Sequence, residues 1–248
     1  MGHEQIAITT RDGECQAHLF TPEGKGEGPW PAAIFYMDAF AIRPTLFEMA
    51  ARLADNGYVV LLPDLFYRHG HYDTLVPREV FAQNTFGTVI APLMASTDTL
   101  KAVADTAAFV AYLDSRDDVA GPFGTIGLCM GGGLAIAAAG AFPDRIAAAA
   151  SFHGGNLYTD QPTSAHLFLP KVEGELYVAA ADQDHSYPPE MAEKFEAALR
   201  DSGVVYRHET YAGAAHGWMK PDLPVYDEAA AERGWAELLA LFARKLKA

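Results

Sequence analysis

The strongest constraint on the fold is a regular alternation of short apolar runs with longer segments whose apolar residues recur at helical spacing. Strands that alternate with helices predict a mainly parallel, twisted sheet with helices on both faces, which is an α/β fold. The helix expected at 96–116 would begin at Ser96 or Thr97, because their side chains are good N-caps. We expect strands at 31–38, 59–66, 123–129, 146–155, 175–181 and 204–213, and helices at 43–58, 96–116, 130–142, 188–203 and 227–248.

Two stretches depart from this alternation. The runs at 4–10 and 14–20 alternate between apolar and polar residues around an Asp-Gly pair, which predicts an N-terminal antiparallel hairpin. Residues 67–95 fit neither period, and such an insertion on an α/β core is typical of a lid or a pocket wall. Because no linker, repeat or change of composition interrupts the chain, we expect residues 1–248 to form a single domain.

Charge and composition argue against several classes of protein. The net charge of −14 disfavours nucleic acids and anionic membrane surfaces as partners, since both select a basic face. No apolar run of about 18 residues or more indicates a transmembrane helix, and the first residues do not resemble a secretory signal. With only two cysteines, Cys15 and Cys129, a disulfide framework is not expected, and a cytoplasmic location fits.

The stretch GTIGLCMGGGLA (124–135) places Cys129 where an apolar strand would turn abruptly into a helix. Gly127 and Gly131 flank it at the spacing of the G-x-S-x-G nucleophile elbow, with sulfur in place of the serine oxygen. The elbow holds its nucleophile at a helix N-terminus, where the helix dipole favours a thiolate. The N–H of Met130, the next residue, could then stabilise a developing oxyanion.

This stretch has two other interpretations. A lone cysteine is most often a small buried hydrophobic residue. A glycine-rich turn can also cradle phosphate, but Gly124, Gly127 and Gly131 do not match the G-x-G-x-x-G spacing, and the P-loop pattern is absent. We therefore favour the nucleophile, for which the elbow predicts two partners further along the chain.

An elbow nucleophile needs an acid after a later strand and a histidine after the last strand. Asp182 and Asp184 both stand at the end of the strand expected at 175–181, and His216 follows the final strand. In this arrangement Cys129 attacks an acyl carbon, His216 stabilises the thiolate and later activates water, and the acid orients the imidazole. The residues alone leave both aspartates as candidates.

Five stretches spread over most of the chain resemble the dienelactone hydrolase family of the α/β-hydrolase fold: FYMDAF (35–40), LLPDLF (61–66), GLCMGGG (127–133), ADQDHSYPPE (181–190) and GAAHGW (213–218). The resemblance implies a hydrolase of a small ester or lactone that needs no cofactor or metal. It selects Asp184 as the acid, with Asp182 as the second choice. It also implies that the N–H of Ala39 is the second oxyanion donor.

Two positions depart from the family pattern. Asp38 matches a glutamate that contacts the resting thiol in well-known members, but its side chain is one methylene shorter. Lys220 stands four residues after the histidine, where members that act on dienelactone use an arginine to hold the substrate carboxylate. Lysine keeps the charge but lacks the bidentate fork of arginine. The resemblance therefore leaves open whether dienelactone itself is a substrate.

The remaining candidates concern the pocket. Phe40, His153, Trp218 and Lys220 stand near expected strand ends where they could line it, with plain packing as the alternative for His153. We interpret the chain as an ester or lactone hydrolase that forms a thioacyl intermediate and prefers activated esters. Two alternatives remain: a non-catalytic binding protein of the same fold, in which Cys129 is a packed thiol, and a thioesterase.

Overall fold

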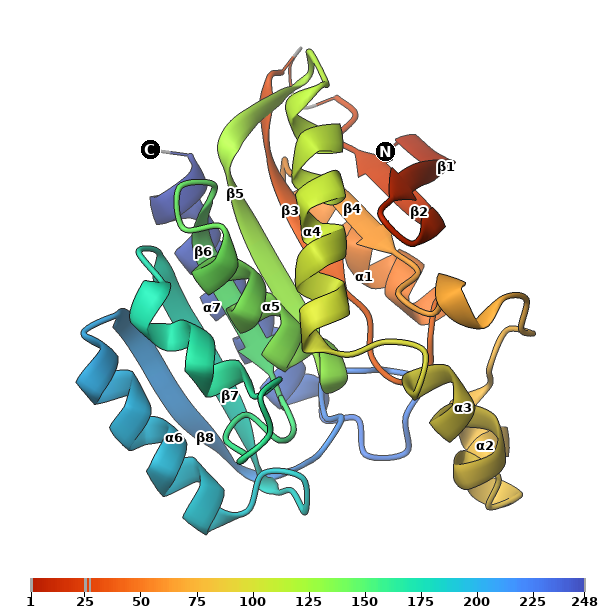
Figure 1. The fold of residues 1–248 in the computed structure, drawn as a ribbon, viewed down its shortest axis with the longest axis vertical. Helices are drawn as coiled ribbons and strands as arrows, with labels where there is room; N and C mark the ends of the chain where they lie inside the picture. Colours follow the sequence, from red (N-terminus) through yellow and green to blue (C-terminus); the bar gives the residue numbers. More distant parts are fainter. Residues whose placement is uncertain (1, 25, 27, 248) are drawn as a thin grey trace.

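The computed structural model describes residues 2–24, 26 and 28–247 (Figure 1). Its centre is an eight-stranded sheet in the order β1-β2-β4-β3-β5-β6-β7-β8. Strands β2 and β4 pair antiparallel, as do β1 and β2, and all other neighbours are parallel, which confirms the predicted sheet. The strands are β1 (Gly2–Thr10), β2 (Gly13–Thr21), β3 (Trp30–Tyr36), β4 (Val59–Pro63), β5 (Val119–Leu128), β6 (Ile146–Phe152), β7 (Glu175–Gln183) and β8 (Val205–Ala215).

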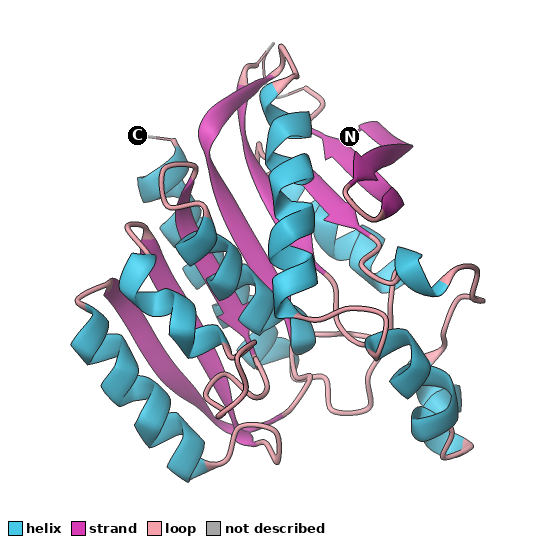
Figure 2. Cartoon of the chain, viewed as in Figure 1, coloured by secondary structure: helices cyan, strands magenta, loops and turns pink. Residues whose placement is uncertain are grey.

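Helices cover both faces of the sheet (Figures 1 and 2). Helices α4 and α5 pack together and against β5 on one face, and α6 joins that layer through its contacts with η3. On the other face, α7 packs against β5, β6 and β7, and α1 packs against β2 and β4. The longer helical segments are α1 (Pro44–Asp55), α4 (Thr99–Asp114), α5 (Met130–Ala141), η3 (Ala165–Lys171), α6 (Pro189–Ser202) and α7 (Glu228–Leu246).

The start of α4 differs from the prediction. Asp98 is the N-cap, and its side chain accepts a hydrogen bond from the N–H of Lys101. The expectation that Ser96 or Thr97 caps this helix is wrong, because the chain is still turning there: the Ser96 hydroxyl donates to the carbonyl of Leu93. The shift leaves Asp98 beside the cavity described below.

Central strands read as continuous apolar runs because helices cover both of their faces. All five residues of β4 are buried, as are Ala32 to Tyr36 in β3 and Phe123 to Leu128 in β5. The carboxyl ends of these parallel strands meet at one edge of the sheet, where α/β proteins place their sites.

Residues 67–95 lie beside this edge as a series of short helical turns (Figure 1). The ion pairs of Arg68 with Asp105 and Asp12 anchor the start of the segment to α4 and the hairpin. Further along, Val80 and Ile90 form a small apolar cluster with Phe40, separate from the main core. The turns are η1 (Tyr67–His69), α2 (Pro77–Ala82), η2 (Phe86–Ile90) and α3 (Ala91–Met94). None of the helices within the described ranges is long and apolar enough to span a bilayer.

Candidate active site

Cys129 occupies a strained turn between β5 and α5. Its backbone has φ 56° and ψ −116°, a conformation that a residue with a side chain seldom adopts. A Cβ on Gly127 would lie 1.8 Å from the carbonyl oxygen of Gly131, and a Cβ on Gly131 would lie 2.3 Å from that of Tyr36. Both glycines are therefore required by close backbone approach, and the half-buried cysteine sits at the helix N-terminus as the elbow pattern predicts.

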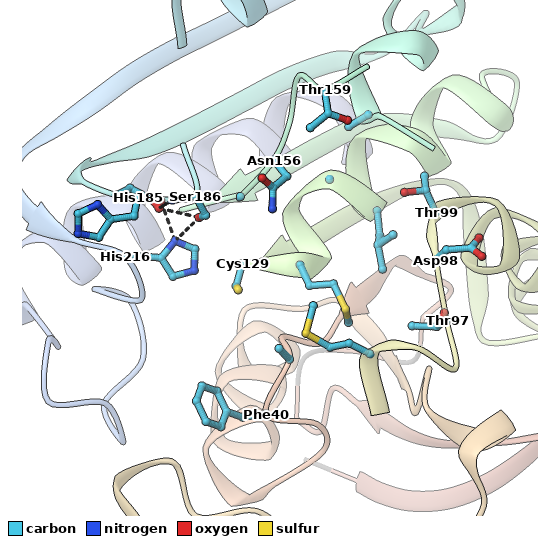
Figure 3. Close-up of a pocket in the computed structure, with 18 of the residues that line it drawn as sticks. Phe40, Thr97, Asp98, Thr99, Cys129, Asn156, Thr159, His185, Ser186 and His216 are labelled. Atoms are coloured by element: carbon cyan, nitrogen blue, oxygen red, sulfur yellow. Dashed lines mark hydrogen bonds and ion pairs between the residues drawn. The ribbon is translucent and has the colours of Figure 1, made fainter. Parts of the chain in front are cut away.

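The structure brings His216 and Asp184 together from the loops that follow β8 and β7 (Figure 3). His216 Nδ1 lies 2.6 Å from Asp184 Oδ2, and the Asp184 side chain is only 1 % exposed. In Figure 3 the His216 ring faces Cys129 across the cavity, whereas His185 points away from it. The imidazole therefore lies between a buried carboxylate and the elbow thiol.

The pKa values of this group shift in opposite directions. Burial alone would raise the pKa of Cys129, but a hydrogen bond with His216 and the charges of His216 and Lys220 outweigh it, so the thiol pKa is lowered. Burial alone would lower the pKa of His216, but hydrogen bonds with Asp184 and Cys129 raise it to about 9. Both shifts favour a proton on the imidazole and a negative charge on sulfur.

Asp182 has a different partner. Its Oδ2 accepts a hydrogen bond of 2.9 Å from the N–H of Gly213, which lies within strand β8 and has φ 77°. This contact ties the ends of strands β7 and β8 together, next to the loop that carries His216. The geometry thus separates the two aspartates that the sequence left as alternatives.

Ala39 and Met130, the expected oxyanion donors, both line the cavity beside Cys129. Neither backbone N–H has a hydrogen-bond acceptor among the residues that the structure describes. Two unsatisfied N–H groups beside a nucleophile are what stabilisation of a tetrahedral oxyanion requires.

Asp38 does not have the environment expected of a residue that contacts the thiol. Its buried carboxylate accepts hydrogen bonds of 2.7 and 3.0 Å from Arg43, one from Lys220, and one of 2.9 Å from the N–H of Phe40. Within the described part of the chain, Asp38 makes no hydrogen bond to Cys129 and acts on it through charge alone, which opposes thiolate formation. Lys220 and Arg43, although burial opposes them, lower the pKa of Asp38 to about 2, so the carboxylate stays ionised.

The cavity next to Cys129 has a volume of about 800 Å³. Of the pocket residues expected from the sequence, Phe40 and Lys220 line it. His153 and Trp218 do not: both are fully buried, with ring centroids 5.8 Å apart, and His153 packs edge-to-face on His216 at 5.2 Å. The expectation that these two line the pocket is wrong, because the turns that carry them fold into the layer behind the histidine.

Sequence reasoning missed three residues of the site. The Ser186 hydroxyl donates to Asp184 Oδ1 at 2.6 Å and lies 3.2 Å from His216 Nδ1. An Asp-x-Ser pattern after a strand end is the signal that could have indicated this contact. Arg43 and Asp222 complete the charged group around Asp38, and no sequence signal connects them, since they are separated by 179 positions.

The structure shows no group of three or more His, Cys, Asp or Glu side chains that could hold a metal ion, within residues 2–24, 26 and 28–247.

Comparisons with known proteins identify relatives of this chain. A protein of Synechocystis sp. named "Putative carboxymethylenebutenolidase" is 26% identical over 248 residues, which cover 98% of this chain and 96% of that one. A "Carboxymethylenebutenolidase" of Pseudomonas sp. is 35% identical over 134 residues, about 53% of each chain.

Solved structures share the fold. A "Putative Dienelactone Hydrolase" from Klebsiella pneumoniae superposes with a TM-score of 0.84 at 20% identity and covers 98% of both chains. A dienelactone hydrolase-like promiscuous phosphotriesterase from metagenomic libraries superposes with a TM-score of 0.76 at 22% identity and covers 99% of both. The model of the Dienelactone hydrolase family matches residues 15–246, and the chain therefore belongs to that family.

Proposed function

We propose that this protein hydrolyses small esters or lactones through a thioacyl intermediate on Cys129. The observation that carries the proposal is the placement of the His216 imidazole between the buried Asp184 carboxylate and the elbow thiol, at the wall of the cavity. Family membership supports a hydrolase acting on an ester or lactone.

The first half-reaction forms the thioacyl enzyme. The thiolate of Cys129 attacks the substrate carbonyl carbon, and the carbonyl electron pair moves to oxygen, where the N–H groups of Ala39 and Met130 stabilise it. When the carbonyl re-forms, the bond to the leaving oxygen breaks, and that oxygen takes the proton of the His216 imidazolium. With a lactone, the same step opens the ring, so the leaving group stays on the acyl chain.

The second half-reaction regenerates the thiolate. Neutral His216 accepts a proton from water as the water oxygen attacks the thioacyl carbon, and Asp184 stabilises the imidazolium that forms. Collapse of this second tetrahedral intermediate breaks the carbon–sulfur bond and releases the acid. Since a thiolate is a good leaving group, it is readily expelled from the first intermediate unless the alcohol leaves well too. We therefore propose a preference for enol and aryl esters, which comparable turnover of alkyl esters would contradict.

The test is hydrolysis of p-nitrophenyl acetate by the wild type, Cys129→Ala and Cys15→Ala. Cys15 is the matched control because it is a second free cysteine, fully buried in β2. We expect the Cys129 variant to fall to background and the Cys15 variant to keep the wild-type rate. Mass spectrometry of quenched enzyme should find one acetyl group on Cys129. Activity that survives in Cys129→Ala would overturn the assignment.

The cytoplasmic location of the protein and its action on oxygen esters, with thioesters as the alternative, stay predictions. The cytoplasmic assignment rests on the two free cysteines and the composition, and fractionation of cells expressing the protein tests it. A thioester screen alongside p-nitrophenyl esters compares the two substrate classes directly.

A further inference from the structure

We infer that the cavity selects uncharged, apolar esters and rejects substrates that carry a carboxylate. This inference rests on the proposed function and names the substrate class of the same site. The structural basis is a charged cluster, Arg43–Asp38–Lys220–Asp222, which already neutralises Lys220, the one lysine or arginine among the described residues of the cavity lining.

Lys220 is the only lysine or arginine among the described residues that line the cavity. Its side chain is 1 % exposed, and its ammonium group forms an ion pair with Asp38, which is fully buried. Arg43 binds the same carboxylate and also Asp222, with its Nε 2.5 Å from Asp222 Oδ2. Two cations therefore face two anions, and the cluster presents no net positive charge to a ligand.

Recruiting Lys220 to a substrate carboxylate would set a second anion against Asp38. Asp38 cannot turn to solvent to avoid this repulsion, because its carboxylate is buried and bound by Arg43 and by the N–H of Phe40. Breaking one arm of a buried ion pair leaves an uncompensated charge, which is strongly unfavourable. The fixed cluster thus withholds the lysine from the substrate.

The other charged groups of the cavity wall do not supply a cation that is free to pair with a substrate carboxylate. Asp184 and Asp98 also line the cavity, and the His216 imidazolium that lines it is already paired with Asp184 and with the Cys129 thiolate. Asp184 is hydrogen-bonded to His216. Asp98 Oδ2 lies 3.8 Å from Nζ of Lys101, a residue that does not line the cavity. An entering carboxylate would lose hydration without gaining a cation in return.

The opposite wall is apolar. Phe40 lies 5.4 Å from the ring of Phe81 and 6.2 Å from that of Phe86, and Met94 and Leu223 continue the surface. Phe81 and Phe86 belong to residues 67–95 and are 52% and 42% exposed, so apolar surface remains for a substrate to cover. An alkyl or aryl group gains binding free energy when it buries apolar surface against these rings, whereas a charged group does not.

Two substrates that differ only in charge test the inference. They are the p-nitrophenyl monoester of adipic acid and the methyl ester of that compound, which share the leaving group and the acyl chain. With each rate divided by that of hydroxide-catalysed hydrolysis, we expect the wild type to favour the methyl ester by at least about tenfold in kcat/KM. Equal values, or a preference for the carboxylate, would overturn the inference.

Two variants test the cause. Asp38→Asn leaves Lys220 and Arg43 with Asp222 alone, so the preference for the methyl ester should shrink by at least about tenfold. The ratio of two substrates on one enzyme is unaffected by loss of folded protein. Phe86→Arg places an unpaired cation at an exposed position of the wall and should raise kcat/KM for the carboxylate substrate, even if Asp38→Asn fails to fold. No gain in Phe86→Arg would mean that the lack of a free cation is not what excludes the carboxylate substrate, and would overturn the inference.

Cys129→Ala separates failure of this inference from failure of the proposed function. If neither ester is cleaved in a Cys129-dependent manner, the proposed function is wrong and the inference falls with it. If both are cleaved through Cys129 without charge preference, the function stands and only the inference is wrong.

Discussion

Ser186 donates its hydroxyl to Oδ1 of Asp184 at 2.6 Å, on the same carboxylate whose Oδ2 lies 2.6 Å from His216. The backbone N–H of Ser186 reaches the same Oδ1 at 2.8 Å. The two oxygens of Asp184 are thus committed to different partners, and the one that faces His216 is held in position. The carboxylate is oriented before substrate arrives, which is what a group that positions an imidazole requires.

We expect the two residues of this pair to differ in their effects on turnover. Asp184→Asn should lower kcat by about 10²–10⁴-fold, because the amide cannot stabilise the imidazolium and favours the wrong tautomer. Ser186→Ala should lower it by only about 2–10-fold, since one hydrogen bond to the carboxylate is lost. Ester hydrolysis at saturating substrate measures both, and an equal loss in the two variants would contradict the separate roles.

The shifted pKa values predict how Cys129 reacts with pH. Because its thiol pKa is lowered, alkylation by iodoacetamide should stay fast below about pH 8.5, the usual pKa of a free thiol. In His216→Ala the stabilising hydrogen bond is gone, burial dominates, and the labelling profile should move to higher pH. Cys15 is an internal reference, since it is fully buried with a raised pKa and should stay unlabelled. Peptide mapping after timed labelling gives both rates.

The same shifts set the limits of activity. The proposed active form has thiolate and imidazolium together, so kcat/KM should rise with pH as Cys129 loses its proton. It should fall again near pH 9, where His216, with a pKa raised to about 9, loses its own. A pH profile that keeps rising well beyond pH 9 would contradict a reactive ion pair.

Gly127 of the elbow and Gly133 of helix α5 predict opposite changes in stability. Gly127→Ala should lower the free energy of unfolding by at least about 3 kcal/mol, because the new Cβ would lie 1.8 Å from a backbone oxygen. Gly133→Ala, whose Cβ would meet its nearest neighbours at 3.6 Å in helix α5, should raise it by about 0.5–1 kcal/mol. Urea unfolding midpoints at unchanged slope measure both. A Gly127 variant as stable as the wild type would refute the close-approach argument.

The aromatic side chains that residues 67–95 contribute to the cavity predict a dependence on the length of the acyl chain. Phe86→Ala should raise KM for p-nitrophenyl octanoate by about 3–10-fold while leaving that for p-nitrophenyl acetate nearly unchanged, because only the longer chain reaches the ring. Val205→Ala is the control, since Val205 is 65% exposed in β8 and lies outside the cavity lining. If Phe86→Ala raises KM equally for both esters, the ring supports the fold of residues 67–95 and does not bind the substrate.

The sequence determined the parts of this protein that depend on local order. Apolar runs of strand length predicted β3, β4 and β5 because a strand covered on both faces has no polar side. The pattern around Cys129 predicted the elbow because the close backbone contacts at positions 127 and 131 leave room only for glycine. The order of nucleophile, acid and histidine followed from the order of the strands, whose carboxyl ends share one edge.

Only the tertiary structure decided which side chains meet at that edge. Asp184 and Asp182 are two positions apart, yet one contacts His216 and the other holds Gly213. Asp38 and Lys220 are 182 positions apart. Their ion pair engages Asp38 away from the Cys129 thiol and Lys220 away from a substrate carboxylate. Each is a plausible functional residue by itself, but a charge acts through its nearest partners, and those partners are set by packing between segments that no local pattern connects.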